Sequence, residues 1–207
     1  PRNGDSWRGT RKCVRPRTSC SSFQDAIITA DQPPRAEKRR VLGVIQARMQ
    51  SKRLPGKVLL NLGGRPVIEH VYSRAAAVEG LDSVVIATTT NEEDDPLVEW
   101  ALRNAVPFYR GSTDDVAGRF LCAAEESGCE LIARFTADCP LLDPRICSQV
   151  VQKALREDLD FCCNYIPPTF PDGLDFSVFK RQKLLTEYKK GMNVYDREHV
   201  TTVFERR

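Results

Sequence analysis

The sequence predicts an α/β fold with a mostly parallel central sheet, and three observations support this prediction. Short apolar runs bounded by turn residues indicate buried strands. Segments with apolar residues at helical spacing separate these runs, as parallel sheets require. Charged residues follow the strands, at the edge where open α/β sheets bind ligands. The predicted strands are residues 41–45, 83–90, 106–109, 130–135, 160–164 and 174–179.

The segments between these strands carry residues typical of helix ends. Pro66 suits the first turn of a helix that ends near Gly80. The acids at residues 92–95 suit the first turn of the next helix better than they suit a metal site. Asp115 and Asp143 are expected to cap two further helices. Apolar stripes cover residues 67–75, 97–102 and 116–124, and later helices are expected at 143–158 and 180–190.

A cationic loop follows the first predicted strand. It contains Arg48, Lys52, Arg53 and Lys57. Four positive charges on a short loop repel each other unless an anion lies among them, and a polyphosphate is the natural candidate. The loop is not a P-loop, because its first glycine is missing and no Ser or Thr follows the lysine. A solvated basic turn is the alternative.

Asp138 follows the fourth predicted strand, where a side chain faces the ligand crevice of a parallel sheet. One carboxylate together with substrate phosphates is the usual way in which proteins hold Mg²⁺. Asp143 precedes Pro144 and is interpreted as a helix cap instead. We therefore expect Mg²⁺ beside Asp138, opposite the cationic loop.

Several motifs give the chain a family resemblance from residue 41 to its end. A-R-x-x-S-x-R-L-P-x-K, followed by L-x-x-L-G-G-R-P-V-I-E-H-V, resembles the opening motif of the sugar-acid cytidylyltransferases. These include the CMP-KDO and CMP-sialic acid synthetases, and the branch called spore coat polysaccharide biosynthesis protein F is the most similar. T-A-D-C-P-L-L-D-P, P-D-G-L-D-F and R-E-H-V-T resemble later motifs of that branch. The resemblance implies a Rossmann-like, three-layer nucleotidyltransferase fold. It also implies an enzyme that transfers CMP from CTP to a sugar acid, for the biosynthesis of surface or coat polysaccharide.

The resemblance also implies which residues form the site. Asp138 would bind the catalytic metal, and Arg48 and Lys57 would be catalytic. The nucleotide would contact Ala47, Arg48, Ser51, Arg53, Lys57, Thr88, Arg110 and Ser112. The sugar would contact Asp172, Asp175, Arg197 and His199. For Asp172 and Asp175 the alternatives are a second metal position and, in Asp-Gly, a simple turn residue. For Arg197 and His199 the alternative is a helix cap with an intrahelical Arg–Glu pair.

Composition separates the first 40 residues from the remainder. Residues 1–40 hold 10 Lys and Arg against 4 acids, whereas residues 41–207 hold 21 against 24. The basic excess belongs to a predicted disordered leader, with a transit peptide or nucleic-acid arm as alternatives, so the domain is not expected to bind nucleic acid. No apolar run would span a bilayer. Eight scattered cysteines without C-x-x-C, and two histidines, argue against zinc and suit reduced thiols in the cytoplasm.

Two alternative functions remain open at this point. A glycosyltransferase that uses a nucleotide-sugar usually carries D-x-D at a strand end, where this chain has T-A-D-C-P. A non-catalytic nucleotide- or sugar-binding module is the other. Relatives continue past the position of Arg207 with a D-T-x-E-D-like motif that supplies a second metal carboxylate. We therefore expect a truncated chain. Members of the family that it resembles are often dimers, so a homodimer is also expected.

Overall fold

The computed structural model describes residues 39–51 and 53–206. The predicted leader lies outside these residues except for Arg39 and Arg40. Arg40 belongs to the fold, because its carbonyl accepts hydrogen bonds from the backbone N–H groups of Glu130 and Leu131, at 3.0 and 3.2 Å. Arg39 pairs with Asp158. Among the described residues, the two that precede the first strand thus contact the domain.

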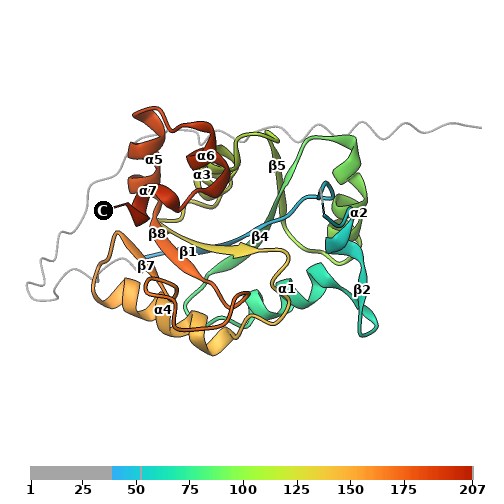
Figure 1. The fold of residues 1–207 in the computed structure, drawn as a ribbon, viewed down its shortest axis with the longest axis horizontal. Coiled ribbons are helices and arrows are strands. Elements are labelled where there is room, and N and C mark those ends of the chain that lie inside the picture. Colours follow the sequence, from blue (N-terminus) through green and yellow to red (C-terminus); the bar gives the residue numbers. More distant parts are fainter. Residues whose placement is uncertain (1–38, 52, 207) are drawn as a thin grey trace, which may run out of the picture. The chain divides into compact units, whose positions relative to one another are not determined.

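A six-stranded sheet with the order β5-β4-β1-β6-β8-β7 forms the centre of the domain (Figure 1). The β1–β4, β1–β6 and β4–β5 pairs are parallel, and β8 runs antiparallel to both β6 and β7. The predicted mostly parallel sheet is therefore confirmed. Its strands are β1 (Val41–Gln46), β4 (Ser83–Thr89), β5 (Phe108–Gly111), β6 (Leu131–Thr136), β7 (Phe161–Cys163) and β8 (Ser177–Lys180).

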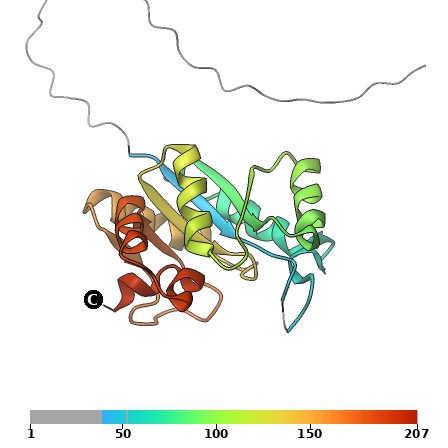
Figure 2. The ribbon, with the colours of Figure 1, turned by 90° about the horizontal axis from the view of Figure 1, so that it is seen from above.

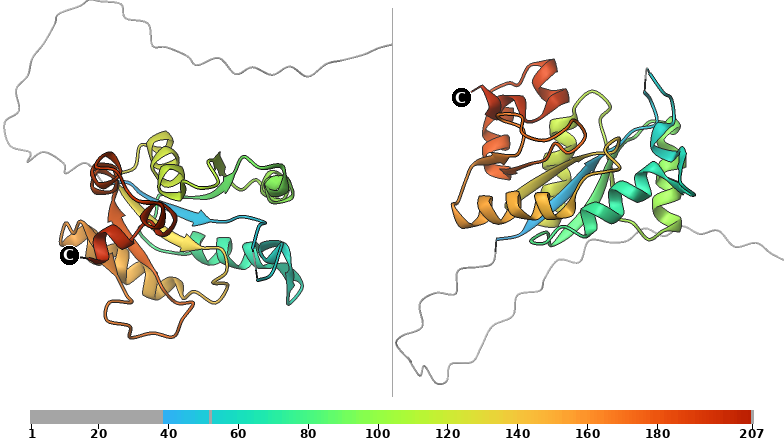
Figure 3. Two further views of the ribbon diagram at one scale, coloured as in Figure 1. Left: turned by 45° about the horizontal axis from the view of Figure 1, so that its top comes forward. Right: turned by 60° about the horizontal axis from the view of Figure 1, so that its bottom comes forward.

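Helices cover both faces of the sheet and give three layers (Figures 2 and 3). One buried cluster combines residues of α1, α2 and α4 with the sheet, and the other combines α3, α5 and the last residues of the domain. The helices are α1 (Val67–Ala76), α2 (Asp95–Arg103), α3 (Val116–Ser127), α4 (Pro144–Arg156), α5 (Arg181–Lys189), α6 (Val194–His199) and α7 (Thr202–Glu205), with 3-10 turns η1 (Lys57–Leu59) and η2 (Glu92–Asp94).

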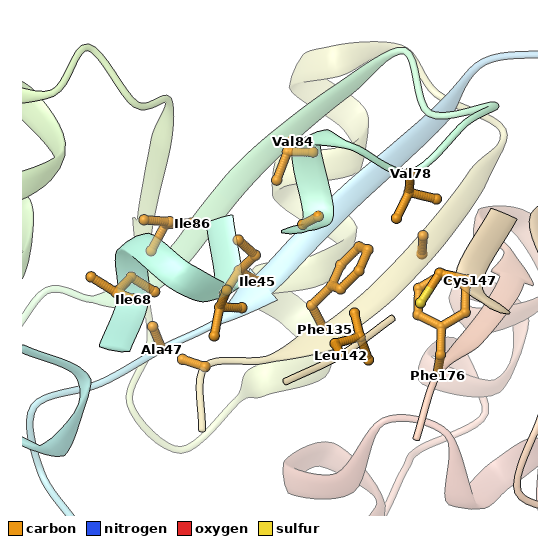
Figure 4. Packing of buried hydrophobic residues seen from close by; sticks show 14 of the residues in the cluster. Ile45, Ala47, Ile68, Val78, Val84, Ile86, Phe135, Leu142, Cys147 and Phe176 are labelled. Carbon is orange, nitrogen blue, oxygen red and sulfur yellow. The ribbon is translucent and has the colours of Figure 1, made fainter. Parts of the chain in front are cut away.

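Side chains of the central strands alternate between these two clusters. In β1, Val41 and Ile45 face the cluster on the α1 and α4 side, whereas Leu42 and Val44 face the other. Figure 4 shows the first cluster, in which Phe135 and Phe176 lie together with their ring centroids 5.0 Å apart. Both faces of β1 are thus buried, which agrees with its near-continuous apolar run.

Some local structure differs from the predictions. The third strand begins at Phe108 and continues through Gly111, so Arg110 lies in a strand and not in a turn. Helix α1 ends at Ala76, before Gly80. Gly63 and Gly64 are the turn of a small hairpin between β2 (Asn61–Leu62) and β3 (Arg65–Pro66), and their φ angles of 61° and 94° suit glycine.

Candidate active site

The carboxyl ends of β1 and β6 lie side by side and start the two loops that carry the predicted charges. Gln46 is the register partner of Thr136, and the Ala137 N–H donates to the Gln46 carbonyl at 3.1 Å. The cationic loop after β1 and the Thr136–Asp138 stretch after β6 therefore leave the sheet at the same edge. This adjacency is what brings residues 81 positions apart into contact.

Lys57 and Asp138 form the central charge pair of this edge. Lys57 Nζ lies 2.5 Å from Asp138 Oδ2, and both side chains are partly exposed. Burial raises the pKa of Asp138, but the hydrogen bond and positive charge of Lys57 outweigh it, and the pKa falls below its ordinary value. The carboxylate is therefore ionised at neutral pH and remains open to a ligand on its exposed side.

A cavity of about 430 Å³ lies beside this pair. Its lining combines cations from the β1 loop with the carboxylate of Asp138, a combination that suits a phosphate chain with a bound cation. The cavity is lined by Gln46, Ala47, Arg48, Gln50, Ser51, Arg53, Lys57, Val58, Arg134, Thr136, Ala137, Asp138, Glu198 and His199.

The structure brings together most of the predicted residues of the β1 loop. Ala47, Arg48, Ser51 and Arg53 line the cavity with Lys57, and Arg48 also lies 3.5 Å from Glu198 on α6. The exposed Arg48 and Arg53 side chains are available to an anion. Among the described residues, Arg48 makes only that long ion pair and Arg53 makes no ion pair. Lys52 lies outside the described residues.

Asp94 holds the β1 loop in position. Its buried carboxylate accepts hydrogen bonds from the Met49 N–H at 2.6 Å and from Thr88 Oγ1 at 3.0 Å, and it accepts two more from Thr89. The Met49 carbonyl in turn accepts the Gly56 N–H at 2.8 Å, next to Lys57. The acids at 92–95 were expected only to cap a helix, so this link across the site was missed.

Four residues that were predicted to contact the ligands do not line the cavity, and other contacts hold each of them. Thr88 is fully buried and donates its hydroxyl to Asp94. Arg110 donates to the carbonyls of Thr89 and Asn91, both at 2.8 Å, and pairs with Asp95. The Ser112 carbonyl accepts a hydrogen bond from buried Arg119, and the Ser112 side chain does not line the cavity. Arg197 belongs to a packing contact: it donates to the Met192 carbonyl and lies over the Tyr188 ring.

The remaining sugar candidates separate in the same way. His199 lines the main cavity and also a second cavity of about 270 Å³, which Asp175 lines as well. Asp172 is exposed on the loop before β8 and lines neither cavity. Its charge acts at a distance: burial raises the pKa of Asp175, and the carboxylate of Asp172 raises it further.

Arg134 is the main site residue that the sequence interpretation missed. It lies in β6 and lines both cavities. Burial lowers the pKa of its guanidinium, whereas the charges of Tyr165, Glu205 and Asp138 oppose this effect. An arginine inside an otherwise apolar strand is the signal that would have identified it, because charged residues are rarely buried without a partner.

The residues at this edge fit a magnesium ion only together with a ligand. No group of three or more His, Cys, Asp or Glu side chains able to hold a metal occurs in the described part of the chain. Asp138 and Glu198 are the carboxylates that line the cavity in the described residues, and Glu198 pairs with Arg48. Asp138 is therefore the residue that would hold Mg²⁺, which commonly binds one or two carboxylates while phosphate oxygens complete its coordination. Within the described residues, no helix combines the length and apolar character required to cross a membrane.

The fold and this site define a nucleotidyltransferase-like protein with a cationic loop after its first strand. The model of the cytidylyltransferase family matches residues 42–207. The chain therefore belongs to the cytidylyltransferase family.

Similar proteins agree with this assignment. An uncharacterized protein of Methanocaldococcus jannaschii is 35% identical over 162 residues, 78% of this chain and 65% of that protein. The spore coat polysaccharide biosynthesis protein SpsF of Bacillus subtilis is 31% identical over 169 residues, 77% of this chain and 70% of that protein. The 3-deoxy-manno-octulosonate cytidylyltransferase of Solibacter usitatus is 34% identical over 122 residues, 58% of this chain and 46% of that enzyme.

A solved structure shows the same likeness in three dimensions. A cytidylyltransferase from Leptospira borgpetersenii superposes with a TM-score of 0.77 at 34% identity, covering 81% of this chain and 71% of that one. The chain spans about two thirds of the length of the M. jannaschii protein and less than half that of the S. usitatus enzyme.

Proposed function

We propose that this protein transfers CMP from CTP to a sugar acid, with a CMP-sugar and pyrophosphate as products. The observation that carries the proposal is the Lys57–Asp138 pair beside a cavity that Arg48 and Arg53 also line. Three cations and one ionised carboxylate suit a triphosphate with a bound divalent cation. Membership of the cytidylyltransferase family favours CTP, and the S. usitatus relative favours a sugar acid as the acceptor.

The reaction places most of its demand on positioning and charge. The anomeric hydroxyl oxygen of the sugar attacks the α-phosphorus of CTP and forms a new P–O bond. The bond from that phosphorus to the α,β-bridging oxygen breaks, pyrophosphate leaves with the electron pair, and the hydroxyl proton passes to solvent. Arg48 and Lys57 stabilise the charge that develops on the phosphate oxygens, and Arg53 and Ser51 support the chain.

Asp138 is the residue that would hold Mg²⁺, which supplies neutralisation of phosphate charge when it is bound. Lys57 Nζ lies 2.5 Å from one oxygen of that carboxylate. A triphosphate in the cavity offers Lys57 an alternative anion, so Asp138 would become free to coordinate the cation. Product use in surface or coat polysaccharide synthesis belongs to the same proposal and is supported by the likeness to the Bacillus subtilis protein.

Calorimetry and product assays test the proposal on the purified protein. We expect CTP to bind more tightly than ATP, GTP or UTP in the presence of Mg²⁺. Pyrophosphate release should then require both CTP and a sugar acid, tested with 3-deoxy-manno-octulosonate and N-acetylneuraminate. Release of a nucleoside diphosphate from a nucleotide-sugar would show a glycosyltransferase instead, and binding without turnover would show a non-catalytic module.

A further inference from the structure

A second cavity adjoins the one proposed for the triphosphate. Its volume is about 270 Å³, and Arg134, Thr136 and His199 line both cavities. Two carboxylates, Asp175 and Glu205, line only the second one. The boundary between the two spaces is therefore marked by a cation, and the far part of the second cavity is acidic.

Arg134 has unused hydrogen-bonding capacity at this boundary. Its Nη2 donates to Gln46 Oε1 at a long 3.3 Å, while its Nε is buried and lacks a hydrogen-bond partner among the described residues. A guanidinium has five N–H donors in a planar arrangement that matches a carboxylate. Leaving such donors unsatisfied in a buried position costs free energy. An anion that accepts hydrogen bonds from them would therefore bind favourably.

The charges around Arg134 restrict where an anionic ligand can place its charge. Asp138 lies on the nucleotide side and Glu205 on the other, and Glu205 accepts a hydrogen bond from the Tyr165 hydroxyl at 2.8 Å. A carboxylate deep in the second cavity would be repelled by Asp175 and Glu205. Hydroxyl groups would instead find acceptors there, because ionised carboxylates accept hydrogen bonds only.

We propose that Arg134 binds the carboxylate of the acceptor sugar acid, and that the acidic cavity beyond it receives the sugar hydroxyls. The inference rests on the proposed function, because it assumes that the first cavity holds CTP. In a 2-keto sugar acid the carboxylate is bonded to the carbon that carries the reacting hydroxyl. An acceptor that turns this hydroxyl toward the α-phosphate therefore places its carboxylate at the boundary between the cavities, beside Arg134.

Calorimetry with an acid and its neutral ester tests this pairing directly. The protein is first saturated with Mg²⁺ and the α,β-methylene analogue of CTP, which cannot release pyrophosphate. The probes are 3-deoxy-manno-octulosonate, N-acetylneuraminate and the methyl ester of each. We expect at least one acid to bind wild-type protein about 10–100 times more tightly than its ester, the range of a hydrogen bond to a charged group.

The variants separate a contact with the acceptor from other roles. Arg134→Gln should remove the preference for acid over ester and leave the affinity for the CTP analogue unchanged, and Arg134→Lys should restore part of the preference. Arg145→Gln, at an exposed position of α4, is the matched control and should change neither. Thermal unfolding shows whether each variant is folded; if Arg134→Gln does not fold, Arg134→Lys carries the test through a reduced preference.

Three results would overturn the inference. An unchanged acid preference in Arg134→Gln would show that the guanidinium does not meet the carboxylate. A parallel loss of affinity for the CTP analogue would assign Arg134 to the nucleotide. Tight binding of the analogue with no binding of either acid would exclude this acceptor site while leaving nucleotide binding intact, whereas failure to bind the analogue at all would count against the proposed function itself.

Discussion

Lys57 Nζ lies 2.5 Å from Asp138 Oδ2, and this contact joins the loop after β1 to the loop after β6. Both residues occupy the carboxyl edge of adjacent parallel strands, where α/β sheets place their ligands. The pair neutralises itself without a ligand, and it can be separated by a ligand that offers phosphate to the lysine and a cation to the carboxylate. Two predictions follow from this property.

Replacing Lys57 by Met should weaken CTP binding and reduce turnover by about 10²–10³-fold, the range found when a donor that stabilises developing charge is removed. The fold should remain, because the lysine side chain is partly exposed and its partner Asp138 can be solvated. Calorimetry with CTP and a pyrophosphate assay measure the effect. Lys153→Met, which removes an exposed lysine from α4, is the control and should match wild type. Equal CTP affinity in the two variants would contradict the role of Lys57.

Replacing Asp138 by Asn should remove the magnesium dependence of CTP binding. Wild-type affinity should increase as Mg²⁺ is titrated, because the carboxylate and the phosphates share the cation. In Asp138→Asn the CTP affinity without Mg²⁺ should be equal or higher, since Lys57 loses its competing partner. Calorimetry across a magnesium series makes the comparison, with Asp160→Asn, at a half-buried aspartate that does not line the cavity, as the control. A variant with the wild-type magnesium response would place the cation elsewhere.

Asp94 should be required for both stability and the shape of the β1 loop. Asp94→Ala leaves the Met49 N–H and the donors of Thr88 and Thr89 without their acceptor. We expect the free energy of unfolding to fall by about 2–4 kcal/mol. Each unsatisfied buried donor costs about 1–3 kcal/mol, and water that enters the space left by the carboxylate would satisfy some of these donors. Urea unfolding measures this loss. A stable variant with unchanged CTP affinity would show that the loop holds itself.

The same residue gives a pH dependence with a definite sign. Burial raises the pKa of Asp94, but hydrogen bonds from Thr89, Met49 and Thr88 outweigh it and lower the pKa below its ordinary value. A lowered folded-state pKa means that the unfolded chain binds more protons. The contribution of Asp94 is therefore complete above the unfolded value of about 3.9 and is lost as pH falls through the folded value. The stability gap between wild type and Asp94→Ala should narrow in that acid range.

The placement of Lys57 and Asp138 at one edge of the sheet was predictable because both loops follow strands that were predicted to be parallel. Both residues lie on loops that follow buried apolar runs, and parallel strands place their carboxyl ends at one edge. The resemblance then named the same residues. The helix cap at Asp143 was equally local: its side chain accepts the Arg145 N–H at 2.8 Å, as Asp-Pro predicts.

The remaining site residues depend on contacts that a sequence does not display. Arg134 was missed because its strand was interpreted as uniformly buried, whereas its side chain faces the boundary of two cavities. Arg197 was expected in the acceptor site or in a pair with the next residue, but its Nη1 lies 3.7 Å from the carboxylate of Asp115, the N-cap residue of α3. In both cases residues distant in sequence determine the surroundings of the arginine, and no local sequence pattern indicates which residues these are.

Arg110 distinguishes a structural from a ligand-binding arginine. Arg110 lies in β5, and its register partner in β4 is Thr88. Pairing with β4 therefore continues β5 through the residues where a turn was expected. The guanidinium then donates to the carbonyls of Thr89 and Asn91 and pairs with Asp95 at 2.7 Å. With its donors so occupied, Arg110 is expected to hold the end of β4 against α2.

Arg110→Met should therefore destabilise the domain without weakening nucleotide binding directly. Two carbonyl acceptors and one carboxylate lose their partner in a partly solvated position, and we expect a loss of about 1–2 kcal/mol. Urea unfolding and CTP calorimetry, performed well below the unfolding midpoint, measure the two quantities separately. Arg103→Met, on the exposed side of α2, controls for loss of charge. A large fall in CTP affinity at wild-type stability would return Arg110 to the nucleotide site, as the family motif first implied.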